Sequence, residues 1–283
     1  FIFIRILLSK IDVLAYLCRD YLNKPKIFKI HAREQCTFLA KCPCKDYLIS
    51  AYEMNITANS FIKFYKSSIG KKVIVAVTGL ALIGFLLGHM IGNLKIYAGA
   101  DKINSYAAWL HSMPIVLWGA RIGLLACFFG HIITTIMLVV QNRRSKGSQY
   151  VYKHTNKASG ASRTMIWSGI IIICFVIYHI LHYTVRFAND YDSSAYIDPN
   201  GNHDVYKMLI DGFSWWPASL FYIFSMALLC WHLSHGFASV FQTLGLRTDK
   251  TWTIIKATGY AYSLVIFVGN CSIPVSVLAG WLS

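Results

Sequence analysis

The sequence predicts an all-α membrane protein with five transmembrane helices, and two observations carry this prediction. Hydrophobic residues make up 56% of the 283 residues, a larger share than ordinary soluble domains contain. Five apolar runs reach about 20 residues each, the length that crosses about 30 Å of hydrocarbon. Because these runs lack the apolar–polar alternation of barrel strands, we expect all five to be helices.

The connections between the spans carry signals of their own. A short amphipathic piece, Asn104–Leu110, is expected at the membrane interface, where Trp109 suits the headgroup level. The long acidic connection 187–214 contains a turn signal at Asp198–Gly201. Pro274 suggests a local kink in the fifth span, to which we assign a packing role. The expected spans are Val73–Asn93, Pro114–Gln141, Thr164–Arg186, Trp215–Leu244 and Thr253–Leu282.

Residues 1–53 differ in composition from the rest of the chain. They mix basic and acidic residues with short apolar stretches, and the opening FIFIRILL is too short to span a membrane. The segment also lacks the ordered regions of a secretory signal. We interpret 1–53 as an over-extended reading frame or a weakly ordered leader, with Met54 as a natural start. The transmembrane domain is then 54–283.

The net charge of +15 is distributed as in a membrane protein rather than in a nucleic-acid-binding protein. Five of the seven acidic residues after Met54 fall in the connection 187–214. Three basic clusters share one side of a five-span chain, so the positive-inside rule predicts a multi-pass protein of the cytoplasmic membrane. Its N-terminus is cytoplasmic and its C-terminus is outside. The clusters are Lys63, Lys66, Lys71 and Lys72; Arg143, Arg144, Lys146, Lys153, Lys157 and Arg163; and Arg247, Lys250 and Lys256.

Four of the predicted spans each contain a deeply placed histidine, which is costly in a bilayer and needs a reason. With a rise of about 1.5 Å per residue, His89 and His179 lie about 25 Å from the basic ends of their spans. These two histidines therefore belong toward the outside. His131 and His232 lie about 22–26 Å from the outer ends of their spans, hence toward the inside.

Two imidazoles facing each other at one depth can occupy both axial positions of a haem iron. The sequence therefore predicts two haems, one at the outer level and one at the inner level, stacked as an electron path across the membrane. The first four spans form the haem-binding bundle. Gly88, Gly130 and Gly236 leave room for the macrocycles, and Arg121 lies where it can pair with a haem propionate.

Other interpretations of the same residues stay open. A lone intramembrane histidine often forms a hydrogen bond between helices. His182 and His235 lie three residues after His179 and His232, share their helix faces, and are alternative ligands on spacing alone. Arg121 is alternatively a side chain that snorkels to the interface.

Two other functional classes use histidines in membranes. The His-x-x-His pairs 179/182 and 232/235 are a feature of membrane di-iron oxidases, but their opposite depths argue against one shared site. A transporter with histidine proton relays would be expected to carry acidic residues in its spans, and the predicted spans contain none.

The motifs around these histidines, taken together, resemble one family. The strings are FLLGHMIGN at His89, FFGHIITT at His131, the run from Ser168-Gly169 through IIIICFVIYH at His179, and WHLSHGF with a trailing QTLG at His232. Their order and spacing resemble the five-helix dihaem cytochrome b subunit of succinate dehydrogenase or fumarate reductase, a succinate:menaquinone oxidoreductase. The resemblance covers about 60–283. It implies that His89 and His179 bind the distal haem, and His131 and His232 the proximal one.

The resemblance also implies the partners. A flavoprotein subunit and an iron–sulfur subunit would bind at the cytoplasmic face, and electrons would pass through two b haems to a quinone, for which the resemblance implies menaquinone. We expect the quinone site near the outer haem. Candidate quinone or propionate residues are Arg121, Asn93, Asn104, Ser105, Trp109 and His111. The nearest rival is the dihaem cytochrome b of another respiratory dehydrogenase.

Overall fold

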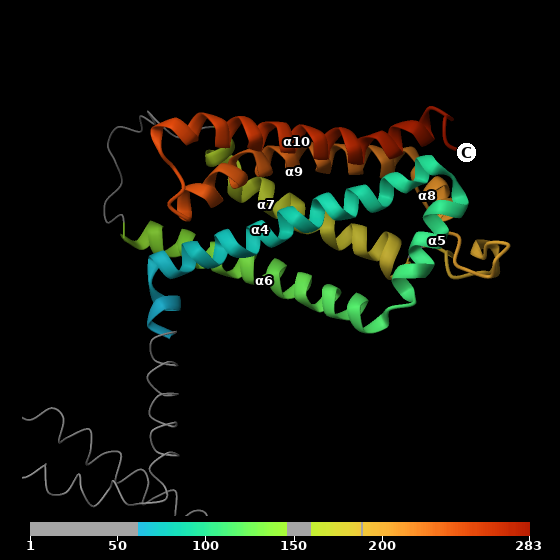
Figure 1. The fold of residues 1–283 in the computed structure, drawn as a ribbon, viewed down its shortest axis with the longest axis horizontal. Coiled ribbons are helices and arrows are strands. Elements are labelled where there is room, and N and C mark those ends of the chain that lie inside the picture. Colours follow the sequence, from blue (N-terminus) through green and yellow to red (C-terminus); the bar gives the residue numbers. More distant parts are fainter. Residues whose placement is uncertain (1–61, 146–159, 188) are drawn as a thin grey trace, which may run out of the picture. The chain divides into compact units, whose positions relative to one another are not determined.

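The computed structural model describes residues 62–145, 160–187 and 189–283. By its internal contacts the chain divides into two units, Phe1–Lys63 and Phe64–Ser283, and the second unit contains every helix discussed below (Figure 1). The leader expected at 1–53 and the start expected at Met54 lie outside the described residues.

Within the described part of the chain, five helices are long and apolar enough to cross a membrane. The prediction of an all-α protein with five candidate spans is therefore confirmed. Most of their ends differ from the expected ones by no more than five residues, and the largest extension is at the start of the first span, which begins at Ser68 instead of Val73. The helices are α4 (Ser68–Asn93), α6 (Pro114–Ser145), α7 (Gly160–His179), α9 (Trp216–Thr243) and α10 (Asp249–Leu278).

The fifth span begins at Asp249, four residues before the expected start, because a capping box precedes it. Thr248 Oγ1 accepts a hydrogen bond from the Thr251 amide at 3.1 Å, and Thr251 Oγ1 accepts one from the Thr248 amide at 2.8 Å. Such reciprocal bonds satisfy the free N–H groups of a first turn. The helix then continues through the buried Pro274 to Leu278.

The third span ends differently from the continuous helix expected to Arg186. The α-helix stops at His179 and is followed by one π-helical turn, η3 (Ile180–Thr184). The Val185 amide donates to the Ile180 carbonyl at 2.8 Å, which is the wider i to i+5 spacing. Arg186 then adopts a positive φ of 55°. The wider turn changes the faces on which the residues after His179 lie.

The four histidine-bearing helices pack in the order α6, α4, α9, α7, and α10 lies along α9 and also contacts α4. A buried cluster of Ile83, Met90, Leu233 and Ile266 joins α4, α9 and α10. The packing role expected for the fifth span is consistent with this cluster.

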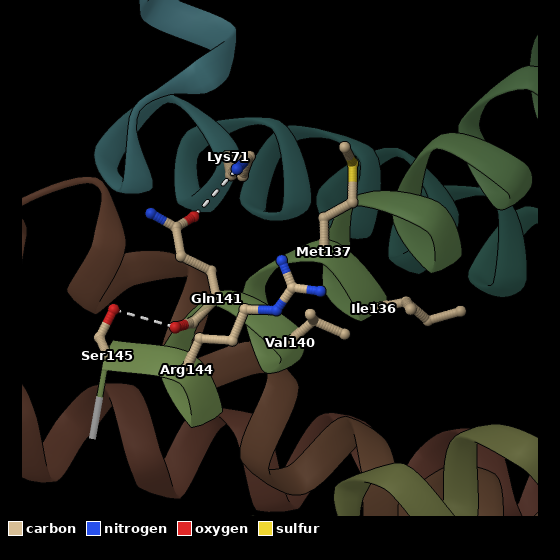
Figure 2. A pocket seen from close by; sticks show the side chains of 7 residues that line it. All are labelled: Lys71, Ile136, Met137, Val140, Gln141, Arg144 and Ser145. Atoms are coloured by element: carbon tan, nitrogen blue, oxygen red, sulfur yellow. Dashed lines mark hydrogen bonds between the residues drawn. The ribbon is translucent and has the colours of Figure 1, made fainter. Parts of the chain in front are cut away.

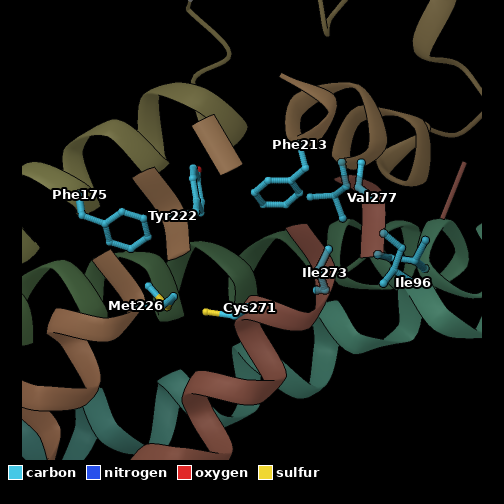
Figure 3. Close-up of a cluster of buried hydrophobic side chains, with 10 residues drawn as sticks. Ile96, Phe175, Phe213, Tyr222, Met226, Cys271, Ile273 and Val277 are labelled. Carbon is cyan, nitrogen blue, oxygen red and sulfur yellow. The ribbon is translucent and has the colours of Figure 1, made fainter. Parts of the chain in front are cut away.

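A second buried cluster lies at the end of the bundle where α4 ends and α9 begins (Figure 3). There η2 (Leu94–Ala98), α5 (Ala100–His111) and α8 (Val205–Ser214) pack against the spans. The cluster contains Ile96, Ile103, Phe175, Leu209, Phe213, Tyr222, Met226, Cys271, Ile273 and Val277.

Helix α8 lies within the connection 187–214 and was not expected from the sequence. Its N-cap is Asp204, whose side chain accepts a hydrogen bond from the Lys207 amide at 3.0 Å. The turn expected before it is confirmed, because Asp198 Oδ1 accepts from the amides of Asn200 and Asn202 at 2.9 and 2.8 Å. Gly201 has a φ of 80°, which glycine adopts without strain.

Candidate functional site

The structure brings His89 of α4 and His179 of α7 together. Their ring centroids are 5.7 Å apart and their planes are nearly perpendicular, at 86°. Two imidazoles that bind one metal ion from opposite sides, with bonds of about 2 Å each, have centroids about 6 Å apart. Phe85 and Phe175 stack against the two imidazoles at 5.3 and 5.9 Å, which limits how far the rings can turn.

Two further side chains contact the outer pair. The Tyr222 hydroxyl of α9 lies 3.2 Å from Nδ1 of His179 and 3.3 Å from Nδ1 of His182. Asn93 Nδ2 donates to Nε2 of His89 at 3.1 Å. A metal bound through Nε2 of His89 therefore requires the Asn93 amide to turn away, whereas the bond to Tyr222 leaves Nε2 of His179 for a ligand.

At the inner level, His131 lies on α6 and His232 on α9, two helices that both pack against α4. Nδ1 of His131 lies 3.2 Å from both Thr78 Oγ1 and the Val75 carbonyl. Since a carbonyl only accepts, this nitrogen carries the proton. Nε2 of His131 then keeps its lone pair, which is the form of histidine that binds a metal.

His232 is held in the same way from α7. Ser168 Oγ lies 3.1 Å from Nδ1 of His232, and the same hydroxyl donates to the Met165 carbonyl at 3.1 Å. A hydroxyl has a single proton, so Ser168 accepts from Nδ1 of His232. The nitrogen left with a lone pair is again Nε2.

A glycine follows each of these hydroxyl residues and makes room for the imidazole. A Cβ atom added at Gly79 would lie 3.2 Å from Cε1 of His131, and one added at Gly169 would lie 4.0 Å from Cε1 of His232. The helix that carries each hydroxyl therefore approaches the histidine closely. Orienting contacts of this kind set the tautomer and basicity of metal-binding histidines.

Three glycines near the histidines are expected to leave room for a planar cofactor. A Cβ atom added at Gly88 or Gly236 would meet nothing within 4 Å, and one at Gly130 would meet only the Thr78 methyl group, at 3.8 Å. Two histidines per site are the donor set that a haem iron takes from a protein, and the three glycines leave space for at least a methyl group where the macrocycles are expected.

The alternative ligands have surroundings of their own. His182 is buried and its ring stacks on Tyr183 with centroids 4.0 Å apart. His235 is half-buried on α9. Among the residues that the structure describes, no three His, Cys, Asp or Glu side chains gather in an arrangement that could hold a metal ion. A di-iron centre needs such a group, whereas a haem iron needs two histidines from the chain.

Asn104 is buried, and both ends of its side-chain amide are engaged. Nδ2 donates to Asp204 Oδ1 at 3.0 Å, and Oδ1 accepts from the Tyr206 amide at 3.0 Å. These bonds connect α5 to the start of α8. A role in holding the two helices together accounts for the burial of Asn104. The neighbouring Ser105 is exposed.

Three other candidate residues lie at the same end of the bundle. The Arg121 guanidinium of α6 lies over the Trp118 ring, 5.1 Å from its centroid. Trp109 is exposed and stacks on Tyr106. His111 is exposed, and its Nδ1 donates to the Ala107 carbonyl at 2.8 Å.

The partners of the histidines are the part of the site that sequence reasoning missed. Sequence reasoning gave no hydrogen-bonding role to Thr78 or Ser168, although each is followed by a glycine that lies ten residues before an outer histidine. Tyr222 was not singled out. A tyrosine inside an apolar span is itself a signal, because its hydroxyl needs a hydrogen-bond partner there.

Comparisons of the chain with protein-family models, curated proteins and solved structures find no match. Over the residues that the structure describes, the fold and the site define a class: a multi-pass membrane protein with five candidate spans, in which His89 and His179 lie side by side and His131 and His232 each contact a hydroxyl of a neighbouring span.

Proposed function

We propose that this protein is the membrane anchor and electron-transfer subunit of a succinate:quinone oxidoreductase, with two b-type haems. The observation that supports this most is the pairing of His89 with His179 at 5.7 Å, beside a second pair whose tautomers leave both Nε2 atoms free. Haem supplies one-electron redox chemistry when it is bound. The four histidines are its proposed axial ligands.

The side chains around the ligands have distinct roles in this proposal. Thr78 and Ser168 accept hydrogen bonds from Nδ1–H of His131 and His232 and so keep Nε2 of each ring available. Tyr222 orients His179. Arg121 is the proposed partner of a haem propionate, since a guanidinium inside a span otherwise carries an unpaired charge.

The proposed partners are a flavoprotein subunit, an iron–sulfur subunit, the lipid bilayer and a quinone, for which we propose menaquinone. The basic ends of the spans are the proposed cytoplasmic docking side in the inner membrane. The quinone site is proposed at the opposite end of the bundle, near Asn93, Trp109, His111 and Arg121. This order would let electrons cross the bilayer between the soluble subunits and the quinone.

Haem stoichiometry of the purified full-length chain tests the proposal. We expect two b haems per chain, with His179→Ala removing one and His232→Ala removing the other. His182→Ala and His235→Ala are the matched controls, because they remove a neighbouring histidine three residues away, and both should keep two haems. A chain that binds no haem, or iron without porphyrin, would overturn the proposal.

The same histidine pairs would also suit a dihaem cytochrome b of another respiratory dehydrogenase, such as one that oxidises formate or hydrogen. Affinity purification from native membranes separates the two. Co-purification of a flavoprotein that oxidises succinate supports our proposal, whereas formate or hydrogen oxidation by the purified complex would support the rival.

A further inference from the structure

A recess of about 550 Å³ lies between α4 and α6, at the basic end of both helices (Figure 2). It belongs to neither histidine pair, since it lies where α4 begins and α6 ends. Its lining combines a polar end with an apolar wall. The lining residues are Lys71, Ile136, Met137, Val140, Gln141, Arg144 and Ser145.

The polar end of the recess is positively charged and pre-ordered. Lys71 Nζ donates to Gln141 Oε1 at 2.9 Å, and Gln141 Nε2 donates to Ser68 Oγ at 2.9 Å, so the lysine is fixed by a neutral amide. Arg144 lies three residues after Gln141 on the same face of α6, and Figure 2 shows its guanidinium group between Gln141 and Met137. Among the described residues, none of those that line the recess is acidic, so the lining itself supplies no counter-charge for the two cations.

The apolar wall follows α6 away from these cations. Ile136, Met137 and Val140 are 57%, 39% and 41% exposed, and Ile133 continues the wall with 53%. All four lie within a helix apolar enough to span a membrane. From Arg144 to Ile133 the helix rises about 16 Å, which is close to half of the roughly 30 Å hydrocarbon thickness.

A ligand that matches both parts has an anionic group at one end and an apolar chain that reaches about one leaflet deep. We propose that this recess binds one anionic phospholipid, with its phosphate between Lys71 and Arg144 and an acyl chain along α6. Basic pockets between helices at a membrane surface bind lipid headgroups in this way. An acidic segment of a soluble protein could pair with the two cations. It would leave the apolar wall uncovered, because that wall lies at membrane depth.

Native mass spectrometry of the full chain in detergent tests this proposal, with phosphatidylglycerol, phosphatidylcholine and inorganic phosphate as separate probes. We expect one phosphatidylglycerol to be retained in preference to phosphatidylcholine. Arg144→Gln should weaken its binding about five-fold, and Lys71→Gln by a similar factor, as expected for one cation each. Inorganic phosphate should not displace the lipid, since it cannot use the apolar wall.

Lys72→Gln and Arg143→Gln are matched controls, because each removes one positive charge next to a lining residue without lining the recess. Both should retain the lipid as the wild type does. Equal losses in the controls would show general attraction to the basic surface and overturn the proposal. Displacement by phosphate would show a site for free anions, which would overturn it too. Arg144 is exposed, so its variant should fold normally, and an unchanged circular dichroism spectrum would verify this.

A second arm tests the apolar wall. Val140→Asn keeps both cations but places a polar group where the acyl chain is proposed to lie. We expect weaker retention of phosphatidylglycerol in this variant, whereas unchanged retention would restrict the site to the headgroup and contradict the proposed acyl contact. None of these readouts depends on haem.

Discussion

Ser168 Oγ on α7 lies 3.1 Å from Nδ1 of His232 on α9, and it accepts a hydrogen bond from that nitrogen because its own hydroxyl group donates to the Met165 carbonyl. Thr78 on α4 stands in the same relation to His131 on α6, at 3.2 Å. Two histidines on two helices are thus set in the same tautomer by a neighbouring span.

If His232 binds haem, removing the Ser168 hydroxyl should weaken that binding. Ser168→Ala leaves Nδ1 of His232 without its acceptor, and loss of such an orienting contact typically costs about 10–100-fold in affinity. Haem titration of the purified chain measures this. Ser234→Ala is the control, because Ser234 lies on the same helix as His232 and its hydroxyl donates to the Trp231 carbonyl of its own helix. Equal affinities for the two variants would contradict the prediction.

The glycines beside the two hydroxyls should respond differently to alanine. Gly79→Ala puts a Cβ atom 3.2 Å from Cε1 of His131, and overpacking of this kind costs about 1–3 kcal/mol. Gly169→Ala makes an ordinary contact at 4.0 Å and improves helix propensity by up to about 1 kcal/mol. Because alanine raises helix propensity at both positions, thermal unfolding in detergent should rank Gly79→Ala below Gly169→Ala, and Gly169→Ala at or above the wild type.

Tyr222 and Tyr183 both lie beside His179 and His182, and they offer a matched pair of substitutions to phenylalanine. The Tyr222 hydroxyl contacts two histidines, so Tyr222→Phe leaves buried polar groups unpaired at a cost of about 1–3 kcal/mol. The Tyr183 hydroxyl is buried without a hydrogen-bond partner among the described residues, so Tyr183→Phe should be neutral or stabilising. Chemical unfolding of both variants checks this, and the reverse order of stabilities would contradict it.

Asn104→Ala should loosen the contact between α5 and α8. The substitution leaves Asp204 Oδ1 and the Tyr206 amide without their buried partner, which costs about 1–3 kcal/mol. Hydrogen exchange should rise in both helices. Ser105→Ala alters an exposed neighbour on α5 and should leave exchange unchanged. Unchanged exchange in Asn104→Ala would show that the two bonds do not hold α5 to α8.

The connection after the third span should lose stability in acid. Burial lowers the pKa of His203 below its ordinary value, and the Arg186 cation lowers it further. The unfolded segment therefore takes up a proton at a higher pH than the folded one. The stability that neutral His203 contributes is complete above its pKa in the unfolded chain, about 6.5. It is lost as the pH falls through its lower pKa in the folded protein.

His203→Gln tests this pH dependence. It keeps an amide that can donate to the Tyr196 carbonyl, which His203 Nδ1 contacts at 3.0 Å, but it does not titrate. Hydrogen exchange of residues 189–204 at pH 8 and pH 5 should change less in the variant than in the wild type. An equal response of both proteins to acid would assign it to other groups.

The long apolar helices are the part of the fold that the sequence predicts best, because the membrane determines their length. The thickness of hydrocarbon fixes how long an apolar run must be, so the five long helices were predictable to within a few residues at most ends. The π turn after His179 was not, because it depends on how His182 and Tyr183 stack against their neighbours in three dimensions.

The same distinction applies to the histidines. Counting residues gives the depth of a side chain, and the structure places His89 beside His179 as depth suggested. Counting does not give the rotation of one helix relative to another, which decides that Ser168 and Tyr222 reach the imidazoles. Those contacts depend on packing between helices far apart in the sequence.

The spacing between each hydroxyl–glycine pair, Thr78-Gly79 or Ser168-Gly169, and the outer histidine on the same helix links the inner and outer histidine sites. Gly79 precedes His89 by ten residues, and Gly169 precedes His179 by ten residues, so α4 and α7 each span about 15 Å between the two sites. Each helix therefore contacts an inner imidazole at its hydroxyl–glycine pair and carries an outer imidazole ten residues later, so its length sets the distance between the two sites. One residue inserted between the pair and the histidine would turn the outer histidine by about 100° around the helix. We therefore expect an inserted residue in either segment to disrupt the outer histidine pair more than a substitution does.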